Sequence, residues 1–235
     1  MLRKIAKEQL FFSDKGWLQS RFHFSFAEYI NHDNVNFGVL RVINDDVIVP
    51  QSGFDMHPHR DMEIVTYVID GELTHKDSMG NEETLGRGEV QYMSAGSGVF
   101  HSEYNNHPTK EVTLLQIWIL PPQKNLPILY GSHRYTEQER KDTLLHIVSS
   151  ESGDAKIKLH QDVNFYVSEL SEGNTLSYNV GQNRQVYFVV IEGELTLNTL
   201  TLNAHDACEC VDETALEIKA TTTDAHFLFI EMAKG

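Results

Sequence analysis

The stretch GFDMHPHRDME, residues 53–63, carries the strongest signal in the chain, because it places His57 and His59 on either side of Pro58. Proline does not continue a helix and favours extended backbone. Side chains two residues apart on an extended strand lie on the same face, so both imidazoles can point at one metal ion. This stretch therefore predicts two metal ligands on one strand.

A second stretch, residues 88–103, ends in His101 and Glu103 at the same spacing of two. If the two extended segments meet inside a barrel, they present three imidazoles and one carboxylate to one ion. Such a set suits Fe(II), Mn, Ni, Cu or Zn better than Ca or Mg. Chance is the rival explanation, since 12 histidines in 235 residues will produce some H-x-H pairs. Two such pairs, each preceded by a glycine-bearing segment, favour the metal site.

The sequence around these stretches predicts an all-β protein with few short helices. Short runs rich in Val, Ile, Tyr and Phe recur between Gly, Asn and Asp turns, which is typical of a β-sandwich or barrel. Residues 78–81 predict a hairpin turn, and Thr136–Arg140 predicts a capped helical turn. The clearest predicted strands are residues 39–43, 64–69, 114–120 and 186–191.

An internal repeat indicates two β-barrel domains. Residues 67–74, YVIDGELT, resemble residues 189–196, VVIEGELT, and the two glycines, Gly71 and Gly193, are 122 residues apart (193 minus 71). A duplicated barrel is the natural explanation, although a strand–turn–strand pattern also recurs by chance. We therefore expect an N-terminal metal-binding barrel at residues 1–122, a linker at 123–145 and a C-terminal barrel at 146–235, with N-terminal strands free to cross over between the barrels.

The second barrel is expected to hold no metal. Shifted by 122 residues, His57 and His59 fall on Asn179 and Gly181. Shifted by 117 residues, which aligns Glu89 with Asp206, His101 and Glu103 fall on Ile218 and Ala220, and all four of these residues are poor ligands. His205 and His226 are expected to be surface or core residues.

The bulk composition limits the partners of the protein. The formal charge of −15 and the absence of a basic cluster argue against direct nucleic-acid binding. No apolar run is long enough to cross a membrane or to form a signal peptide, so we expect a cytoplasmic protein without membrane contact. A monomer is a separate expectation. Cys208 and Cys210 are expected to face opposite sides of a strand and to remain reduced thiols.

The two histidine stretches resemble the motifs of the cupin superfamily. The first cupin motif, G-x5-H-x-H-x3/4-E-x6-G, is followed with small spacing changes by Gly53, His57, His59, Glu63 and Gly71. The chain differs from the second cupin motif, because Ser94 stands where the motif has a proline and Glu103 follows His101. Those departures resemble the pirin family, whose patterns H-P-H-R, T-A-G-x-G and H-x-E are similar to residues 57–60, 94–98 and 101–103.

The resemblance implies a quercetin 2,3-dioxygenase-like bicupin, with two cupin-type jelly-roll domains packed together. It implies one divalent metal, most often Fe(II), with Mn, Ni, Cu or Zn as alternatives. It nominates as ligands His57, His59, His101 and Glu103. Glu63 remains the rival carboxylate, because many cupins use it and its spacing from His59 permits the same face.

The resemblance also implies an activity. Pirin-like proteins are associated with quercetin 2,3-dioxygenase activity, in which dioxygen opens a flavonol such as quercetin and carbon monoxide is released. Glu103 would then accept the proton of the 3-hydroxyl group. A non-enzymatic, iron-binding, redox-sensitive regulator that acts through protein partners is the alternative.

Other residues near the candidate ligands are assigned by their place in the sequence. His75 and Asp77 are candidates for a pair beside the metal ligands or on the surface, and their position on a hairpin favours exposure. The candidates for lining an apolar pocket for a flat aromatic molecule, each equally plausible as part of the barrel core, are Phe54, Met56, Met93, Val99 and Phe100.

Overall fold

The structure is a computed structural model and describes residues 1–221 and 224–234. It is built almost entirely of strands, which confirms the predicted fold class. The chain divides into two compact units. We call residues 11–134 and 159–161 the first barrel, and residues 1–10, 135–158 and the described chain from Asp162 onward the second barrel. In the described part of the chain, no helix is long and apolar enough to cross a membrane.

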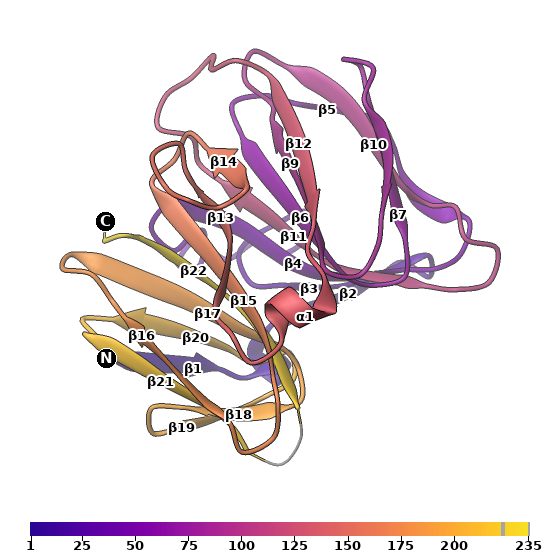
Figure 1. Cartoon of the computed structure of the whole chain (residues 1–235). Helices are drawn as coiled ribbons and strands as arrows, with labels where there is room; N and C mark the ends of the chain where they lie inside the picture. Colours follow the sequence, from indigo (N-terminus) through magenta and orange to yellow (C-terminus); the bar gives the residue numbers. More distant parts are fainter. Residues whose placement is uncertain (222–223, 235) are drawn as a thin grey trace. The chain divides into compact units, whose positions relative to one another are not determined.

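The first barrel consists of two antiparallel sheets (Figure 1). The seven-stranded sheet has the order β12 (Leu129–Arg134), β9 (Glu89–Ser94), β6 (Glu63–Asp70), β11 (Val112–Ile119), β4 (Leu40–Ile48), β3 (Leu18–Phe22) and β2 (Phe11–Asp14). The four-stranded sheet has the order β5 (Ser52–His59), β10 (Val99–Asn105), β7 (Leu73–Asp77) and β8 (Glu82–Leu85).

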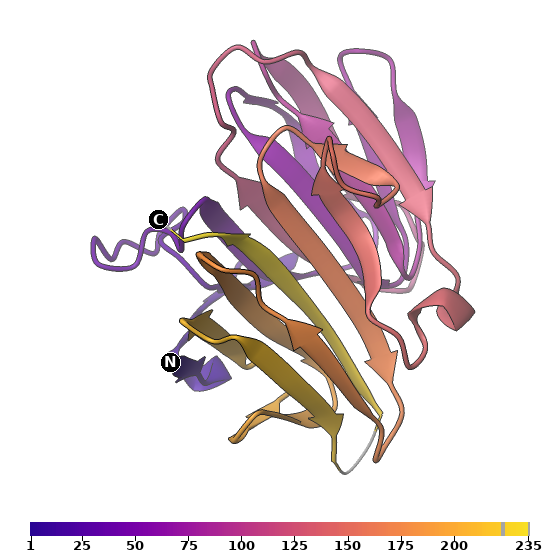
Figure 2. The same ribbon diagram turned by 60° about the vertical axis from the view of Figure 1, so that its left-hand side comes forward.

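The second barrel repeats this plan (Figure 2). Its seven-stranded sheet has the order β1 (Leu2–Ile5), β20 (Ala207–Val211), β17 (Arg184–Glu192), β22 (Ala225–Ala233), β15 (Val163–Leu170), β13 (Leu145–Ser150) and β14 (Ile157–Leu159). Its four-stranded sheet has the order β16 (Thr175–Asn179), β21 (Ala215–Ala220), β18 (Glu194–Leu197) and β19 (Leu200–Asn203). Two short helices complete the described chain: a 3-10 helix (Lys7–Gln9) and α1 (Glu137–Arg140).

The repeated glycines occupy equivalent turns in the two barrels. Gly71 links β6 to β7 and Gly193 links β17 to β18, and both have a φ of +78°. A Cβ atom at Gly71 would lie 2.3 Å from the carbonyl oxygen of Glu111, and one at Gly193 would lie 2.2 Å from that of Asp224. The left-handed backbone and the close approach both require glycine. The sequence repeat thus reflects a repeated turn geometry.

The predicted strands are confirmed, since they overlap β4, β6, β11 and β17 and extend at most one residue beyond them, at Val39 and Leu120. The helical turn is also confirmed, because Thr136 Oγ1 accepts a hydrogen bond from the backbone N–H of Glu139 at the start of α1. Part of the segment expected as a linker forms β12, which pairs with β9. The expected placement of Cys208 and Cys210 is wrong, since side chains two apart on a strand share one face. Both lie in the core of the second barrel with their sulfur atoms 4.0 Å apart.

A polar layer crosses the interior of the first barrel between two apolar clusters. Along β6, Ile64 and Val68 belong to separate apolar clusters, and Thr66 lies between them on the same face. Neighbouring strands place further polar side chains beside Thr66, because the register pairs Thr66 with Gln116 and Gln91, and Gln116 with Asn44. All four side chains of this polar layer are buried. Buried polar groups need partners, so this layer identifies where a site is built.

Candidate metal centre

The two histidine stretches meet as neighbouring antiparallel strands. β5 carries His57 and His59, β10 carries His101 and Glu103, and the register places His101 opposite His57. The register then shifts, so that Glu103 lies opposite Phe54. This irregularity is a β-bulge on β5, and such bulges re-aim side chains next to functional sites.

The three histidines form a compact imidazole cluster. Their ring centroids are 4.5 Å apart for His57 and His101, and 4.8 Å apart for both other pairs. One nitrogen from each ring lies within 4.8 Å of one nitrogen from each of the other two. The structure therefore brings these three predicted ligands together.

The tautomer of His57 leaves a lone pair directed at the cluster. Nδ1 of His57 lies 2.7 Å from the carbonyl oxygen of Asp55, which can only accept, so Nδ1 carries the proton. Its Nε2 then faces Nε2 of His101 at 3.0 Å. Two nitrogens that each lie about 2.1 Å from one ion, at a right angle, are about 3.0 Å apart. The imidazole cluster therefore fits a transition metal.

Burial keeps two of these rings neutral. It lowers the pKa of His59 to about 4, with help from the neighbouring rings of His101 and His57. It lowers the pKa of His101 to about 3, with help from His57 and His75. A metal ligand must be deprotonated, and these two rings are deprotonated at neutral pH.

Glu103 is fixed by the polar layer. Its Oε2 accepts a hydrogen bond from Nε2 of Gln116 at 2.7 Å, and its Oε1 accepts one from Oγ1 of Thr66 at 3.2 Å. The carboxylate oxygens lie close to His101 and His75, in a second group whose ligand atoms are within 4.8 Å of one another. One carboxylate oxygen of Glu103 therefore lies within 4.8 Å of a ring nitrogen of His101, at the edge of the imidazole cluster.

His75 is the residue that sequence reasoning missed. The expectation of an exposed hairpin is wrong, since His75 is fully buried and Asp77 is also buried. Nε2 of His75 lies 3.3 Å from Oδ2 of Asp77, and its ring stacks on Tyr130 at 4.9 Å. The available signal was the spacing of two residues between His75 and Asp77, because it places both side chains on one face of a strand.

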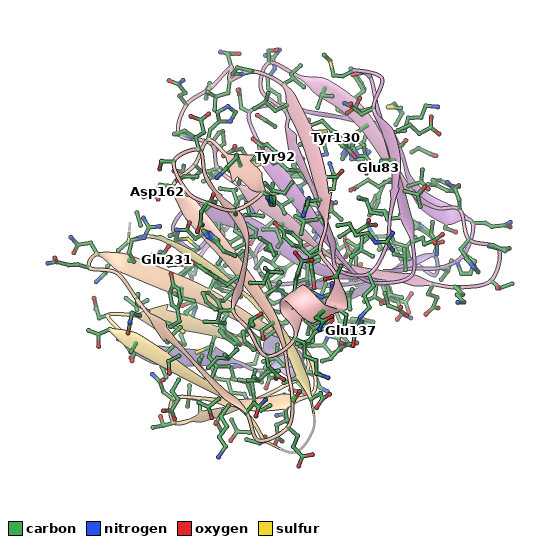
Figure 3. The ribbon with its side chains drawn as sticks, viewed as in Figure 1. Glu83, Tyr92, Tyr130, Glu137, Asp162 and Glu231 are labelled. Atoms are coloured by element: carbon green, nitrogen blue, oxygen red, sulfur yellow. The ribbon has the colours of Figure 1, made fainter. Side chains whose placement is uncertain are left out.

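Tyr130 and Glu83 close this side of the barrel. Oη of Tyr130, on β12, donates a hydrogen bond to Oε2 of Glu83, on β8, at 2.8 Å, and the two side chains are labelled in Figure 3. Burial is the main cause that raises the pKa of Tyr130 above its ordinary value, and this hydrogen bond is the second. The contact joins the two sheets beside His75.

Glu63 is engaged away from the imidazole cluster. It is fully buried on β6, where Oε1 accepts hydrogen bonds from Oη of Tyr92 at 2.7 Å and from the backbone N–H of His160 at 2.8 Å. Oε2 accepts from the backbone N–H of Gln161 at 3.0 Å. These bonds attach residues 160 and 161 to the sheet, so the geometry gives Glu63 a structural role.

A cavity of about 190 Å³ opens beside the candidate ligands. It is lined by His57, His59 and Glu103 on one sheet and by strands β3, β4 and β11 on the other. Its apolar walls are mainly aromatic: Phe22, Phe26, Phe54 and Trp118.

The expected pocket lining was right for one of its five residues, since Phe54 lines this cavity. Met56 and Phe100 are about half exposed, whereas Met93 and Val99 belong to an apolar core cluster. Phe22, Phe26 and Trp118 come from distant parts of the chain. No sequence signal connects them to the histidines.

The histidines of the second barrel, unlike those of the first, form no candidate metal group among the described residues. Among residues 1–221 and 224–234, both groups that could hold a metal ion lie in the first barrel. Nδ1 of His226 lies 3.1 Å from a carboxylate oxygen of Glu192.

Comparison with known proteins is consistent across the whole chain. Residues 4–119 match the Pirin family and residues 146–232 match the quercetinase C-terminal cupin domain. The chain is 39% identical over 217 residues to a quercetin 2,3-dioxygenase of Escherichia coli K12, covering 92% of this chain and 93% of that protein. It is 39% identical over 234 residues to a pirin-like protein of Caulobacter vibrioides, covering 99% and 100%.

A solved structure agrees with these relatives. The bacterial pirin YhhW of Escherichia coli, in complex with nickel(II), is 35% identical and superimposes with a TM-score of 0.94 over 100% of both chains. The fold, the two matched domains and the similarity over the full length all lead to one assignment. The chain belongs to the pirin family.

Proposed function

We propose that this protein is a metal-dependent dioxygenase that opens a flavonol such as quercetin at the 2,3 position. One observation carries the proposal: a single cavity joins the imidazole cluster and Glu103 to an aromatic wall that suits a flat ring system. The name of the Escherichia coli relative, quercetin 2,3-dioxygenase, supports the same reaction class. The reaction would insert both atoms of dioxygen into the product and release one ring carbon as carbon monoxide.

We assign the metal to His57, His59, His101 and Glu103. The deprotonated rings of His59 and His101 and the lone pair of His57 support three of these ligands, and a Glu103 oxygen within 4.8 Å of a His101 ring nitrogen supports the fourth. Fe(II) is our first choice, with Mn, Ni, Cu or Zn as alternatives, and the nickel(II) complex of the Escherichia coli pirin supports a divalent transition metal. When bound, such an ion supplies Lewis acidity and a partner for dioxygen.

The protein's own residues would position the substrate and move its proton. Phe22, Phe54 and Trp118 would hold the flat rings and exclude water from the cavity. Glu103 would accept the proton of the 3-hydroxyl group, since its carboxylate lines the cavity. Gln116 and Thr66 would hold that carboxylate in place through their hydrogen bonds.

The test is turnover by protein reconstituted anaerobically with Fe(II). On admission of air, oxygen uptake, loss of quercetin absorbance and release of carbon monoxide should appear together. All three should be lost in the double variant His57→Ala, His101→Ala and kept in His32→Ala, which alters an exposed histidine. Tight metal binding without turnover would contradict the proposal and favour the alternative role of an iron-binding regulator.

A further inference from the structure

One wall of the cavity carries polar groups that the proposed metal centre does not use. Asn44 and Asp46 lie two apart on β4, so their side chains share one face, and both line the cavity. Asn44 is 4% exposed and Asp46 is 2% exposed. They face the cavity from the seven-stranded sheet, whereas the histidines belong to the four-stranded sheet.

Asn44 and Asp46 each have a side-chain oxygen that accepts no hydrogen bond from the described residues. Oδ1 of Asp46 accepts a hydrogen bond from Oγ of Ser20, its register partner on β3, and Oδ2 makes no hydrogen bond to the described residues. The side-chain oxygen of Asn44 is buried without a hydrogen-bond partner there. A carboxylate offers about four acceptor positions, and a buried acceptor that stays unpaired is costly. The wall is therefore prepared for a donor from a ligand.

The chemistry of the cavity specifies that donor. Phe22, Phe26 and Trp118 suit a flat aromatic ring, while Glu103 would repel a ligand that carries a carboxylate or a phosphate. A phenolic hydroxyl is uncharged, lies in the plane of an aromatic ring and donates one hydrogen bond. The amide of Asn44 can both donate and accept, so it can pair with a second hydroxyl beside the first.

We propose that Asn44 and Asp46 form a subsite that binds phenolic hydroxyl groups of the substrate and so selects polyhydroxylated flavonols. This inference rests on the proposed function. Ser20 acts as a positioning residue, because its hydroxyl fixes the orientation of the Asp46 carboxyl group.

The test compares two flavonols on the Fe(II)-loaded protein without oxygen, where binding occurs without turnover. Quercetin carries hydroxyls on both outer rings, and 3-hydroxyflavone has the same reacting ring without them. Calorimetric titration should show that the wild-type protein prefers quercetin. At about pH 8, above the Asp46 pKa of about 7, the carboxyl is charged, and Asp46→Asn should weaken quercetin binding roughly tenfold or more, the loss of a hydrogen bond to a charged group, and leave 3-hydroxyflavone unchanged. Asn44→Ala should act in the same direction, whereas Asp45→Asn, on the opposite face of β4, should change neither.

The outcomes separate this inference from the proposed function. Equal weakening of both ligands in Asp46→Asn, or no weakening of either, would overturn the subsite even if the wild-type protein turns over quercetin. Failure of the wild-type protein to bind either flavonol would overturn both proposals. If Asp46→Asn does not fold, Asn44→Ala decides the question by the same comparison.

Discussion

Nε2 of Gln116 donates a hydrogen bond to Oε2 of Glu103 at 2.7 Å, and this contact joins the polar layer of one sheet to the candidate metal centre on the other. Both side chains are buried, so the bond is shielded from water. Glu103 is therefore oriented before any ion or substrate arrives.

Removing this donor should weaken the metal centre without unfolding the protein. Gln116→Leu is expected to lower metal affinity roughly 10- to 100-fold, the usual effect of losing a group that orients a ligand. Calorimetric titration of the metal-free protein with Fe(II) or Ni(II) measures this, and Gln19→Leu, at an exposed position on β3, is the matched control. Unchanged affinity would show that Glu103 needs no support or does not bind the metal.

Two single variants should distinguish the structural role of Glu63 from the metal-binding role of Glu103. Glu63→Ala is expected to lower the free energy of unfolding by roughly 3 to 5 kcal/mol, because it removes the acceptor of the buried Tyr92 hydroxyl and of the partly buried backbone N–H groups of His160 and Gln161. Metal affinity of the folded fraction should stay the same. Glu103→Ala should instead reduce metal affinity. Urea denaturation and metal titration measure the two effects, and loss of metal binding in Glu63→Ala would reverse the assignment.

His75 should support the centre from outside the ligand set. X-ray absorption of the loaded metal should show the same number of imidazole ligands in His75→Asn as in the wild-type protein. A weaker affinity is still expected, since the His75 ring contacts His101 at a centroid distance of 5.3 Å. Loss of one imidazole from the spectrum would instead place His75 among the ligands. His75, His101 and Glu103 already offer ligand atoms within 4.8 Å of one another.

Asp46 should make stability depend on pH. Burial raises its pKa from 3.8 to about 7, against the hydrogen bond from Ser20 and with help from Asp45 and Glu103. Between these values the folded protein keeps a proton that the unfolded chain has released. The stability contributed by this carboxyl is therefore complete below pH 3.8 and is lost as the pH rises through about 7.

Asp46→Asn removes this titration, so the metal-free variant should gain melting temperature relative to the metal-free wild-type protein as the pH is raised through about 7. Thermal unfolding at a series of pH values measures the difference. A difference that does not change with pH would mean that the carboxyl is charged throughout.

The duplicated turns give a test of backbone geometry. Gly71→Ala should be more destabilising than Gly80→Ala: both positions have positive φ, but a Cβ atom at Gly80 meets nothing within 4 Å. Positive φ alone costs a non-glycine residue roughly 1 to 3 kcal/mol. The additional loss of stability in Gly71→Ala relative to Gly80→Ala therefore measures the clash with Glu111. Gly193→Ala should behave like Gly71→Ala. Equal effects at Gly71 and Gly80 would contradict this account.

The sequence predicted the parts of the site that depend on strand periodicity. His57 and His59, and His101 and Glu103, share faces because each pair is two apart on a strand. The pairing of β5 with β10, and the bulge that sets Glu103 opposite Phe54, depend on contacts between strands more than 40 residues apart, which no local pattern encodes. His75 was misplaced for the same reason: β7 lies between β10 and β8, which makes its inner face part of the interior.

The first strand of the chain has a consequence for how the protein is made. β1 pairs with β20, so that Leu2 lies opposite Cys210. During synthesis β1 leaves the ribosome before its partner β20, which follows about 200 residues later in the chain, so β1 has no partner over that interval. A C-terminal fragment that begins in the expected linker would leave one edge of β20 without its neighbour, and an open strand edge promotes aggregation. Attempts to express the second barrel alone should therefore carry residues 1–10 with it, as a fused or co-expressed segment.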